Sequence, residues 1–241
     1  MAKAFWPGPL TIVLPLKVNS DIHPLATAGL DTVGIRVPQG FAGELIKAFN
    51  RPLAAPSANS SGKISPTSAP HVEDDLGEKI KLILDAGSAV VGVESTIVKV
   101  ESDGTLRLLR PGGLASQDIE RVAGKKLLRS ATASPAIEAP GMLASHYAPG
   151  AAVRLEATTV ETGEAIITFG KIQPLPGQDK AKVVLNLSPS ADLAEAAANL
   201  FGYLKLADAS GADSIAVTAI PLHGLGEAIN DRLARAAAPR S

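Results

Sequence analysis

Residues 53–67 read LAAPSANSSGKISPT, an apolar entry followed by small polar side chains. The pattern predicts a strand that ends near Ala55, a loop, and a helix that begins at Thr67. Ser57 and Asn59 alternate, so in an extended chain both side chains point the same way and offer a hydroxyl and an amide to one ligand. As a helix N-cap, Thr67 would lie beside free N–H groups that favour a phosphate or carboxylate. A polar loop with an ordinary cap explains the same residues equally well.

Short apolar runs rich in β-branched residues flank this loop on both sides and predict strands. Their ranges are 10–16, 32–37, 80–84, 95–100 and 106–109. Helical spacing of apolar residues predicts helices over 40–50, 67–76 and 117–123. Strands mixed with short helices in this way predict an α/β domain with a twisted mixed sheet that is partly antiparallel.

Proline, glycine and small residues dominate 130–150, which is typical of a linker. Beyond it, strands and helices alternate over 152–155, 165–169, 182–187, 192–209, 214–219 and 226–237. This alternation predicts a small Rossmann-like α/β domain. We therefore divide the chain into a first domain over 1–125, a linker over 126–150 and a second domain over 151–241.

The composition excludes several classes of function. The 241 residues carry 23 Lys and Arg against 24 Asp and Glu, a net charge of −1, so no global field recruits nucleic acid or an anionic membrane. Without cysteine there is no thiolate nucleophile or thiolate metal site, which fits a reducing compartment. No apolar run approaches a membrane span, and we expect a cytoplasmic protein without a membrane partner.

Two arginines and an aromatic pair are candidates for ligand contacts. Arg36 lies inside the apolar run 32–37, where a charge needs a partner or a ligand. Arg110 ends the predicted strand 106–109 and could pair with a phosphate or carboxylate in bidentate fashion, or form a surface ion pair. His146 and Tyr147 lie in the linker of a chain with only 3% aromatic residues, and could stack on a base or attach the linker to the first domain.

Six strings, in chain order, resemble the YrdC-type domain of L-threonylcarbamoyladenylate synthases. They are FWPGPLT at 5–11, VGIRVP at 33–38, PSANSSG at 56–62, SPT at 65–67, GVEST at 92–96 and LRPG at 109–112. PGM at 140–142, HYAP at 146–149 and EAINDRL at 227–233 resemble the linker and C-terminal domain of the longer, two-domain form. The resemblance extends over nearly the whole chain.

The resemblance implies a nucleotidyltransferase that makes threonylcarbamoyl-AMP and pyrophosphate from L-threonine, bicarbonate and ATP. It implies that ATP is a substrate accompanied by Mg²⁺, and that neither a protein nucleophile nor a resident metal is required. By matching positions, the threonine-binding residues would be Arg36, Ser57 and Ser95. The ATP-binding residues would be Thr32, Asn59, Thr67 and Arg110, with His146 and Tyr147 closing over the nucleotide.

The family also has an upstream, strand-rich segment with a K-x-R motif that contacts ATP and threonine. Nothing in this sequence matches it, so we expect a YrdC-like domain that is incomplete at its N-terminus. The alternative function is a non-catalytic nucleotide- or RNA-binding module, or an inactive fragment of the enzyme. As partners beyond the substrates, we expect handover to the tRNA threonylcarbamoyl transfer machinery and at most weak binding of tRNA or double-stranded RNA.

Overall fold

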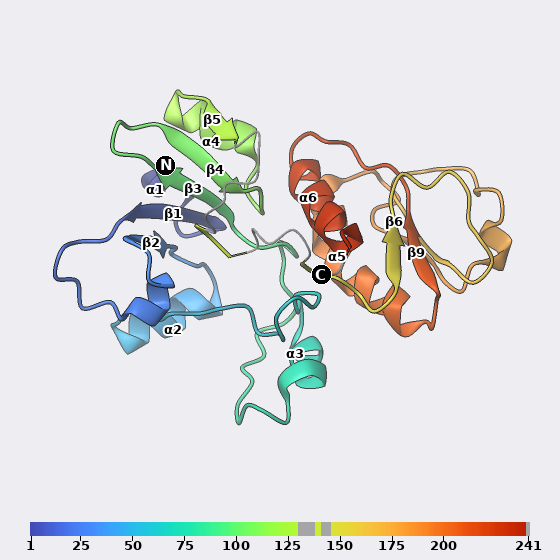
Figure 1. Cartoon of the computed structure of the whole chain (residues 1–241), viewed down its shortest axis with the longest axis horizontal. Coiled ribbons are helices and arrows are strands. Elements are labelled where there is room, and N and C mark those ends of the chain that lie inside the picture. Colours follow the sequence, from blue (N-terminus) through green and yellow to red (C-terminus); the bar gives the residue numbers. More distant parts are fainter. Residues whose placement is uncertain (130–137, 141–145, 240–241) are drawn as a thin grey trace. The chain divides into compact units, whose positions relative to one another are not determined.

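The computed structural model describes residues 1–129, 138–140 and 146–239. The chain divides into two compact units, and each unit consists of two separate stretches of the sequence. One unit comprises Met1–Pro56 and Glu94–Met142, and the other comprises Ser57–Val93 and Leu143–Ser241. Figure 1 labels the helices and strands of both.

The first unit contains a five-stranded mixed sheet with strand order β2-β1-β3-β4-β5. β1 pairs with β2, and β3 with β4, in antiparallel fashion, whereas β1 with β3 and β4 with β5 are parallel. The strands are β1 (Leu10–Pro15), β2 (Thr32–Ile35), β3 (Thr96–Val100), β4 (Leu106–Arg110) and β5 (Leu127–Arg129). Its helical segments are α1 (Ala2–Phe5), η1 (Pro24–Thr27), α2 (Phe41–Phe49) and α4 (Ser116–Ala123). The predicted mixed, partly antiparallel sheet is confirmed.

The two faces of this sheet differ because successive side chains of a strand point to opposite sides. One face packs Leu10, Ile12 and Val98 against Ile119 of α4. The opposite face carries the smaller apolar cluster Val13, Ile97, Leu109 and Ala139. A register shift between Ile97 and Val98 brings Arg110 opposite Ile97, so Arg110 belongs to this second face.

The second unit is built on a parallel four-stranded sheet with order β6-β9-β7-β8. Its strands are β6 (Ala152–Arg154), β7 (Ala165–Thr168), β8 (Val184–Asn186) and β9 (Ser214–Val217). Its helical segments are α3 (Ala69–Leu76), η2 (Gln178–Lys180), α5 (Leu193–Ala209) and α6 (Gly226–Ala237). The strand and helix alternation predicted for the C-terminal part is confirmed.

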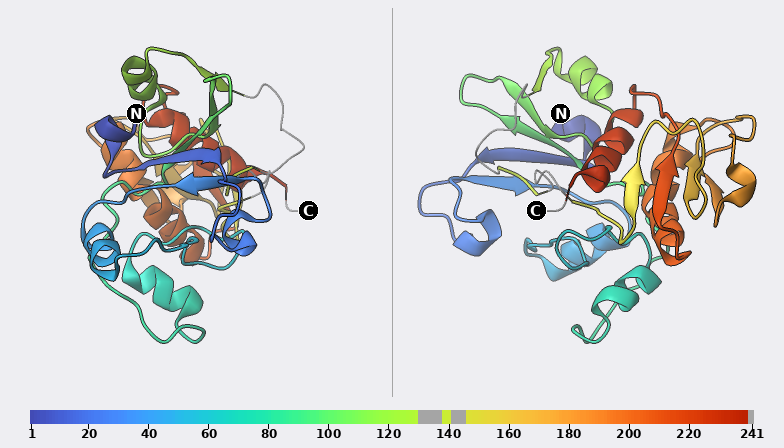
Figure 2. Two further views of the ribbon diagram at one scale, coloured as in Figure 1. Left: turned by 90° about the vertical axis from the view of Figure 1, so that its left-hand side faces the viewer. Right: turned by 45° about the vertical axis from the view of Figure 1, so that its right-hand side comes forward.

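Alternation along the strands also determines how this second sheet is covered. Ile167 and Ile215 point into a core with buried side chains of α5 and α6. Ile166 and Ala216 point to the other face, where they pack with residues from the loops around 157–160 and 175–181. Figure 2 shows α5 and α6 lying alongside the strands. Both helices therefore cover the same face, and loops cover the other.

Four sequence predictions about elements are wrong. No strand ends near Ala55, because residues 52–57 are irregular and pair with no other strand. The run at 80–84 forms no strand, and its Leu82 and Leu84 are 72% and 52% exposed. Ser68, not Thr67, is the N-cap residue of α3. β5 lies within the range predicted as linker and pairs with β4.

No helix of the described part of the chain is long and apolar enough to span a bilayer.

Candidate functional site

Four strands begin or end at one end of the first sheet. β1 and β3 begin there, and the antiparallel β2 and β4 end there. Thr11 of β1, Ser95 just before β3 and Arg110 at the end of β4 share the face that carries Ile97. Hydroxyl groups and a guanidinium are thus adjacent, a combination suited to a carboxylate or phosphate.

Ser95 and Arg110 are in direct contact, although sequence reasoning assigned them to different substrates. Arg110 Nε and Nη2 donate to the Ser95 carbonyl oxygen at 3.2 and 3.0 Å, and Nη2 lies 3.4 Å from Ser95 Oγ. Ser95 Oγ lies 2.7 Å from Thr11 Oγ1 in a hydrogen bond. Both side chains are buried, so the backbone of Ser95 holds the guanidinium in place.

Thr32 begins β2, and Arg36 directly follows its last residue. Thr32 pairs with Pro15 at one end of the strand, and Ile35 pairs with Ile12 at the other. Alternation puts Thr32 on the same face as Thr11. The prediction that Arg36 lies inside an apolar strand is wrong, because β2 ends at Ile35 and Arg36 is exposed.

Residues 138–140 of the predicted linker pack on this same sheet face. Glu138 forms ion pairs with Lys99 of β3 and with Arg107 of β4, the latter at 3.0 Å. Ala139 joins the apolar cluster, and Pro140 O accepts a hydrogen bond from Arg110 Nη1 at 3.2 Å. Hydrogen bonding to Lys99 and the charge of Arg107 hold the pKa of Glu138 below its ordinary value.

The loop that contains Ser57 and Asn59 belongs to the second unit and is held by its own side chains. Asn59 Nδ2 donates to the carbonyl oxygens of Ser60 and Lys63 at 2.9 and 3.2 Å. This leaves Asn59 Oδ1 buried without a hydrogen-bond partner among the described residues. Asp75 of α3 accepts hydrogen bonds from Ser60 and Lys63. Ser57 is exposed.

Thr67 precedes α3 and bonds to a histidine of that helix. Its backbone N and its Oγ1 each lie 3.3 Å from His71 Nδ1. Burial and the charge of Lys205 lower the pKa of His71, which favours the neutral ring as the acceptor of the backbone N–H. The Thr67 hydroxyl therefore contacts an imidazole and does not cap the helix.

The aromatic pair of the linker packs within the second unit. The Tyr147 side chain is 1% exposed, and its ring stacks on Phe201 at a centroid distance of 5.3 Å. The guanidinium of Arg232 lies 5.2 Å from the Tyr147 ring centroid, a cation–π distance. His146 meets Tyr147 edge to face, and its backbone N–H donates to Arg235 O at 3.3 Å. Helix α6 thus holds this end of the linker.

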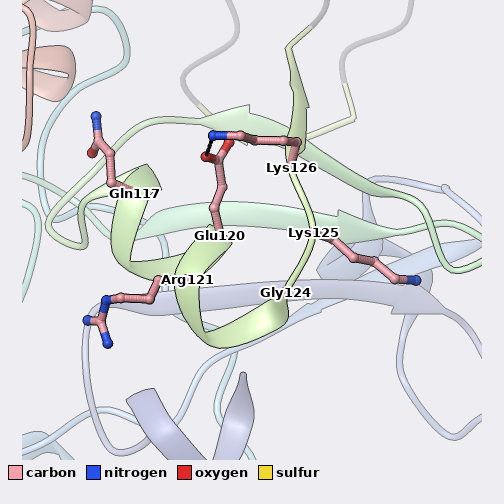
Figure 3. A pocket seen from close by; sticks show the side chains of 6 residues that line it. All are labelled: Gln117, Glu120, Arg121, Gly124, Lys125 and Lys126. Atoms are coloured by element: carbon pink, nitrogen blue, oxygen red, sulfur yellow. Dashed lines mark hydrogen bonds and ion pairs between the residues drawn. The ribbon is translucent and has the colours of Figure 1, made fainter.

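A shallow surface pocket of about 360 Å³ lies elsewhere in the first unit. Figure 3 shows its lining residues on α4 and the turn after it, and a dashed line joins Glu120 to Lys126. This ion pair joins Lys126 Nζ to Glu120 Oε2 at 2.8 Å. None of the predicted site residues lines it. Among the described residues, no group of three or more His, Cys, Asp or Glu side chains is placed to hold a metal ion.

Comparisons with known proteins agree with this architecture. A family model described as "Telomere recombination" matches residues 1–112, and one described as "Threonylcarbamoyl-AMP synthase, C-terminal domain" matches residues 114–238. The chain belongs to the threonylcarbamoyl-AMP synthase family. The threonylcarbamoyl-AMP synthases of Pyrococcus abyssi and Bacillus subtilis are 40% and 38% identical to it; the alignments span all of this chain and 73% and 72% of those proteins.

Solved structures of threonylcarbamoyl-AMP synthase relatives match the fold. The crystal structure of P. abyssi Sua5 complexed with L-threonine has a TM-score of 0.83 and 38% identity, over 98% of this chain and 72% of that one. A variant of the same protein, with a histidine and the adjacent tyrosine replaced by alanine, matches with a TM-score of 0.83. The mixed α/β architecture in two parts is therefore that of this family.

The structure shows contacts of three residues, Thr11, Asp75 and Glu138, that the sequence does not predict. Thr11 ends the FWPGPLT motif, and nothing in the sequence indicates its hydrogen bond to Ser95. Asp75 carried no signal, because one carboxylate on a helix is usually a solvated surface residue. The Glu138 ion pairs join positions far apart in the chain, and no sequence periodicity reports such contacts.

Proposed function

We propose that this chain is a threonylcarbamoyl-AMP synthase, which converts L-threonine, bicarbonate and ATP into threonylcarbamoyl-AMP, pyrophosphate and water. The main support is the cluster of hydroxyl and guanidinium groups at one end of the first sheet. The chain that carries this cluster aligns over its whole length with enzymes of that name. ATP and bicarbonate are anions at neutral pH, and L-threonine carries a carboxylate group, so the cluster offers the donors that these groups require.

The proposed residue roles follow the chemistry of each group. Arg36 would pair with the threonine carboxylate, and Ser57 and Ser95 would bind its polar atoms. Arg110 would neutralise phosphate charge; the other proposed ATP contacts are Thr32, Asn59, Thr67, His146 and Tyr147. Arg36 is exposed, which supports its role as a ligand contact. These assignments are proposals, as are the domain boundaries 1–125, 126–150 and 151–241.

The reaction requires that the substrates are positioned and their charges stabilised, and it needs no covalent intermediate on the protein. The neutral threonine amine adds to bicarbonate or to the CO₂ released from it, and a carbamate forms with loss of water. A carbamate oxygen then attacks the α-phosphorus, and the bond to the β,γ-pyrophosphate breaks. Donors fixed before reaction stabilise the charge that develops on phosphate oxygens.

Mg²⁺ would enter this reaction with ATP. The described residues offer no carboxylate cluster for it, and Mg²⁺ at nucleotide sites is commonly held by phosphate oxygens and water. It would supply charge neutralisation on the triphosphate, while Arg110 contributes the fixed positive charge of the protein. We further propose a cytoplasmic location and handover of the product to the tRNA-modifying machinery.

Pyrophosphate release tests the proposal. The chain is incubated with ATP, Mg²⁺, L-threonine and bicarbonate, and each component is omitted in turn. We expect release that requires both L-threonine and bicarbonate. Ligand-induced stabilisation without pyrophosphate would indicate a binding module, and neither stabilisation nor release would indicate an inactive fragment.

A further inference from the structure

Asp75 of α3 is the centre of a contact network in the loop that carries Ser57 and Asn59. Its Oδ2 accepts the Ser60 backbone N–H at 2.5 Å. Its Oδ1 accepts from Ser60 Oγ and from Lys63 Nζ, both at 2.9 Å. The Asp75 side chain is only 8% exposed, whereas that of Lys63 is 65% exposed. One buried carboxylate therefore holds a turn from the neighbouring helix.

The loop depends on these contacts because it has no sheet or helix of its own between Pro56 and α3. The Lys63 backbone N–H bonds back to Ser60 O at 3.3 Å, and Asn59 Nδ2 bonds to both ends of that turn. Ile64, directly after the turn, is buried in the core of the second unit. The turn at 60–63 is thus tied on one side to Asp75 and on the other to the core.

The orientation of Asn59 follows from this turn. Both hydrogen bonds of its Nδ2 end on carbonyl oxygens within the turn, which leaves the buried amide oxygen of Asn59 without a hydrogen-bond partner among the described residues. If the turn opened, the Asn59 amide would lose its acceptors, and Ser57 would lose the fixed segment after it. Hydrogen bonds to a buried carboxylate are among the stronger ones in proteins, so this loss is substantial.

We propose that Asp75 is a positioning residue of the synthase, which presents Asn59 and Ser57 to the substrates by holding the turn at 60–63. This inference rests on the proposed function. Asp75 itself touches no substrate; it acts through Ser60 and Lys63. Its pKa is held below the ordinary range, first by the Ser60 backbone hydrogen bond and then by Lys63, so the carboxylate stays ionised near neutrality.

The test compares three variants of the full chain. Asp75→Asn keeps the shape of the side chain but removes its charge and one acceptor. Asp74→Asn makes the same change on the adjacent, exposed position of α3. Lys63→Met removes the exposed cation and its hydrogen bond to Asp75 Oδ1 but keeps the hydrogen bonds from Ser60. Isothermal titration measures L-threonine and ATP affinity, and hydrogen exchange measures the protection of the Ser60 amide.

We expect Asp75→Asn to weaken binding of at least one substrate by about tenfold, to raise KM more than it lowers kcat, and to speed exchange at Ser60. Lys63→Met should have a smaller effect, and Asp74→Asn none. Unchanged substrate affinity in Asp75→Asn, with only a lower melting temperature, would overturn the inference. If the unaltered chain binds neither substrate, the proposed function fails; slow Ser60 exchange retained in Asp75→Asn would separately overturn the loop-holding role.

Discussion

Ser95 contacts Arg110 mainly through its carbonyl oxygen, which accepts from two guanidinium nitrogens. Lysine at position 110 would keep the charge but lose this two-pronged contact. We expect Arg110→Lys to lower the free energy of unfolding by about 1–3 kcal/mol and to weaken ATP binding more than threonine binding. Urea unfolding and calorimetric titration measure both effects.

Arg121→Lys is the matched control for this substitution. Arg121 is exposed and pairs only with Asp118 among the described residues, so neither stability nor binding should change appreciably. Equal losses of ATP and threonine affinity in Arg110→Lys would contradict a phosphate role, since the damage would then be general.

Glu164 gives the second unit a predictable response to acid. Its side chain, 3% exposed, accepts hydrogen bonds from Arg154, the Glu161 backbone and Ser214. The bond from Arg154 is the main reason that its pKa falls to about 2. A carboxyl whose pKa is lowered by folding stabilises the folded state at a pH above its pKa in the unfolded chain. This stabilisation is lost as the pH falls toward the pKa of the carboxyl in the folded chain.

Urea unfolding between pH 7 and pH 3 tests this response. We expect the unaltered chain to lose about 2 kcal/mol more than Glu164→Gln across that interval. Glu161→Gln, an exposed neighbour, should follow the unaltered chain. Parallel pH curves for the unaltered chain and Glu164→Gln would refute the assignment.

At the scale of residues, the sequence indicates candidate side chains by their chemistry but not the groups that they contact. Alternation predicts that Ser57 and Asn59 serve one ligand; in the structure Ser57 is exposed and Asn59 bonds to carbonyl oxygens of its own loop. It could not identify Asp75, whose role depends on α3 folding back onto Ser60 and Lys63. Thr67 and Ser68 are both acceptable N-caps by residue type, and backbone geometry, not composition, decides between them.

At the scale of elements, a glycine permits the close approach of the turn after β4 to the start of β3. A Cβ on Gly112 would lie 2.3 Å from Glu94 O and 2.4 Å from Thr96 N, both backbone atoms. Gly113 N–H also bonds to Glu94 O at 2.8 Å. Any side chain at position 112 must therefore displace the backbone beside Ser95.

We expect Gly112→Ala to destabilise the fold by about 1–3 kcal/mol or more and to reduce threonine affinity. Gly202→Ala, inside α5 where a Cβ meets nothing within 4 Å, should instead stabilise it by up to about 1 kcal/mol. Denaturant unfolding of the two variants measures these opposite changes in the free energy of unfolding. An unchanged free energy in Gly112→Ala would contradict the expectation, since the backbone near Glu94 and Thr96 would then move aside at no cost.

Two helices differ sharply in how they bury their apolar stripes. Phe41, Leu45 and Phe49 of α2 are 48%, 40% and 55% exposed, whereas Leu200 of α5 is fully buried. We expect Leu200→Ala to cost about 2–5 kcal/mol of unfolding free energy, and Phe49→Ala less than about 1 kcal/mol. Chemical denaturation compares the two, and a large loss for Phe49→Ala would mean that α2 is covered in solution.

Elements with their own periodicity could be predicted, and elements that depend on a distant partner could not. α5 and α6 occupy nearly the ranges predicted from apolar spacing. The run at 80–84 has strand-like residues, but no described strand pairs with it, so it stays irregular. β5 is three residues long beside two lysines, and only its pairing with β4 makes it a strand.

At the scale of the whole molecule, the order of motifs along the chain carried more information than any motif alone. The two family models meet between residues 112 and 114, and together they cover almost the full chain. The compact units are not contiguous, since residues 57–93 group with the C-terminal part. Composition changes along the chain can indicate only contiguous domains, so they could not predict that residues 57–93 group with the C-terminal part.

The most direct test of the central claim follows the carbon of bicarbonate. The chain is incubated with ¹³C-bicarbonate, L-threonine, ATP and Mg²⁺, and the nucleotides are analysed by mass spectrometry. The account predicts a ¹³C-labelled threonylcarbamoyl-AMP formed in equal amount to pyrophosphate. Pyrophosphate or AMP released without any labelled adduct, or no turnover under conditions in which the chain is folded, would contradict it.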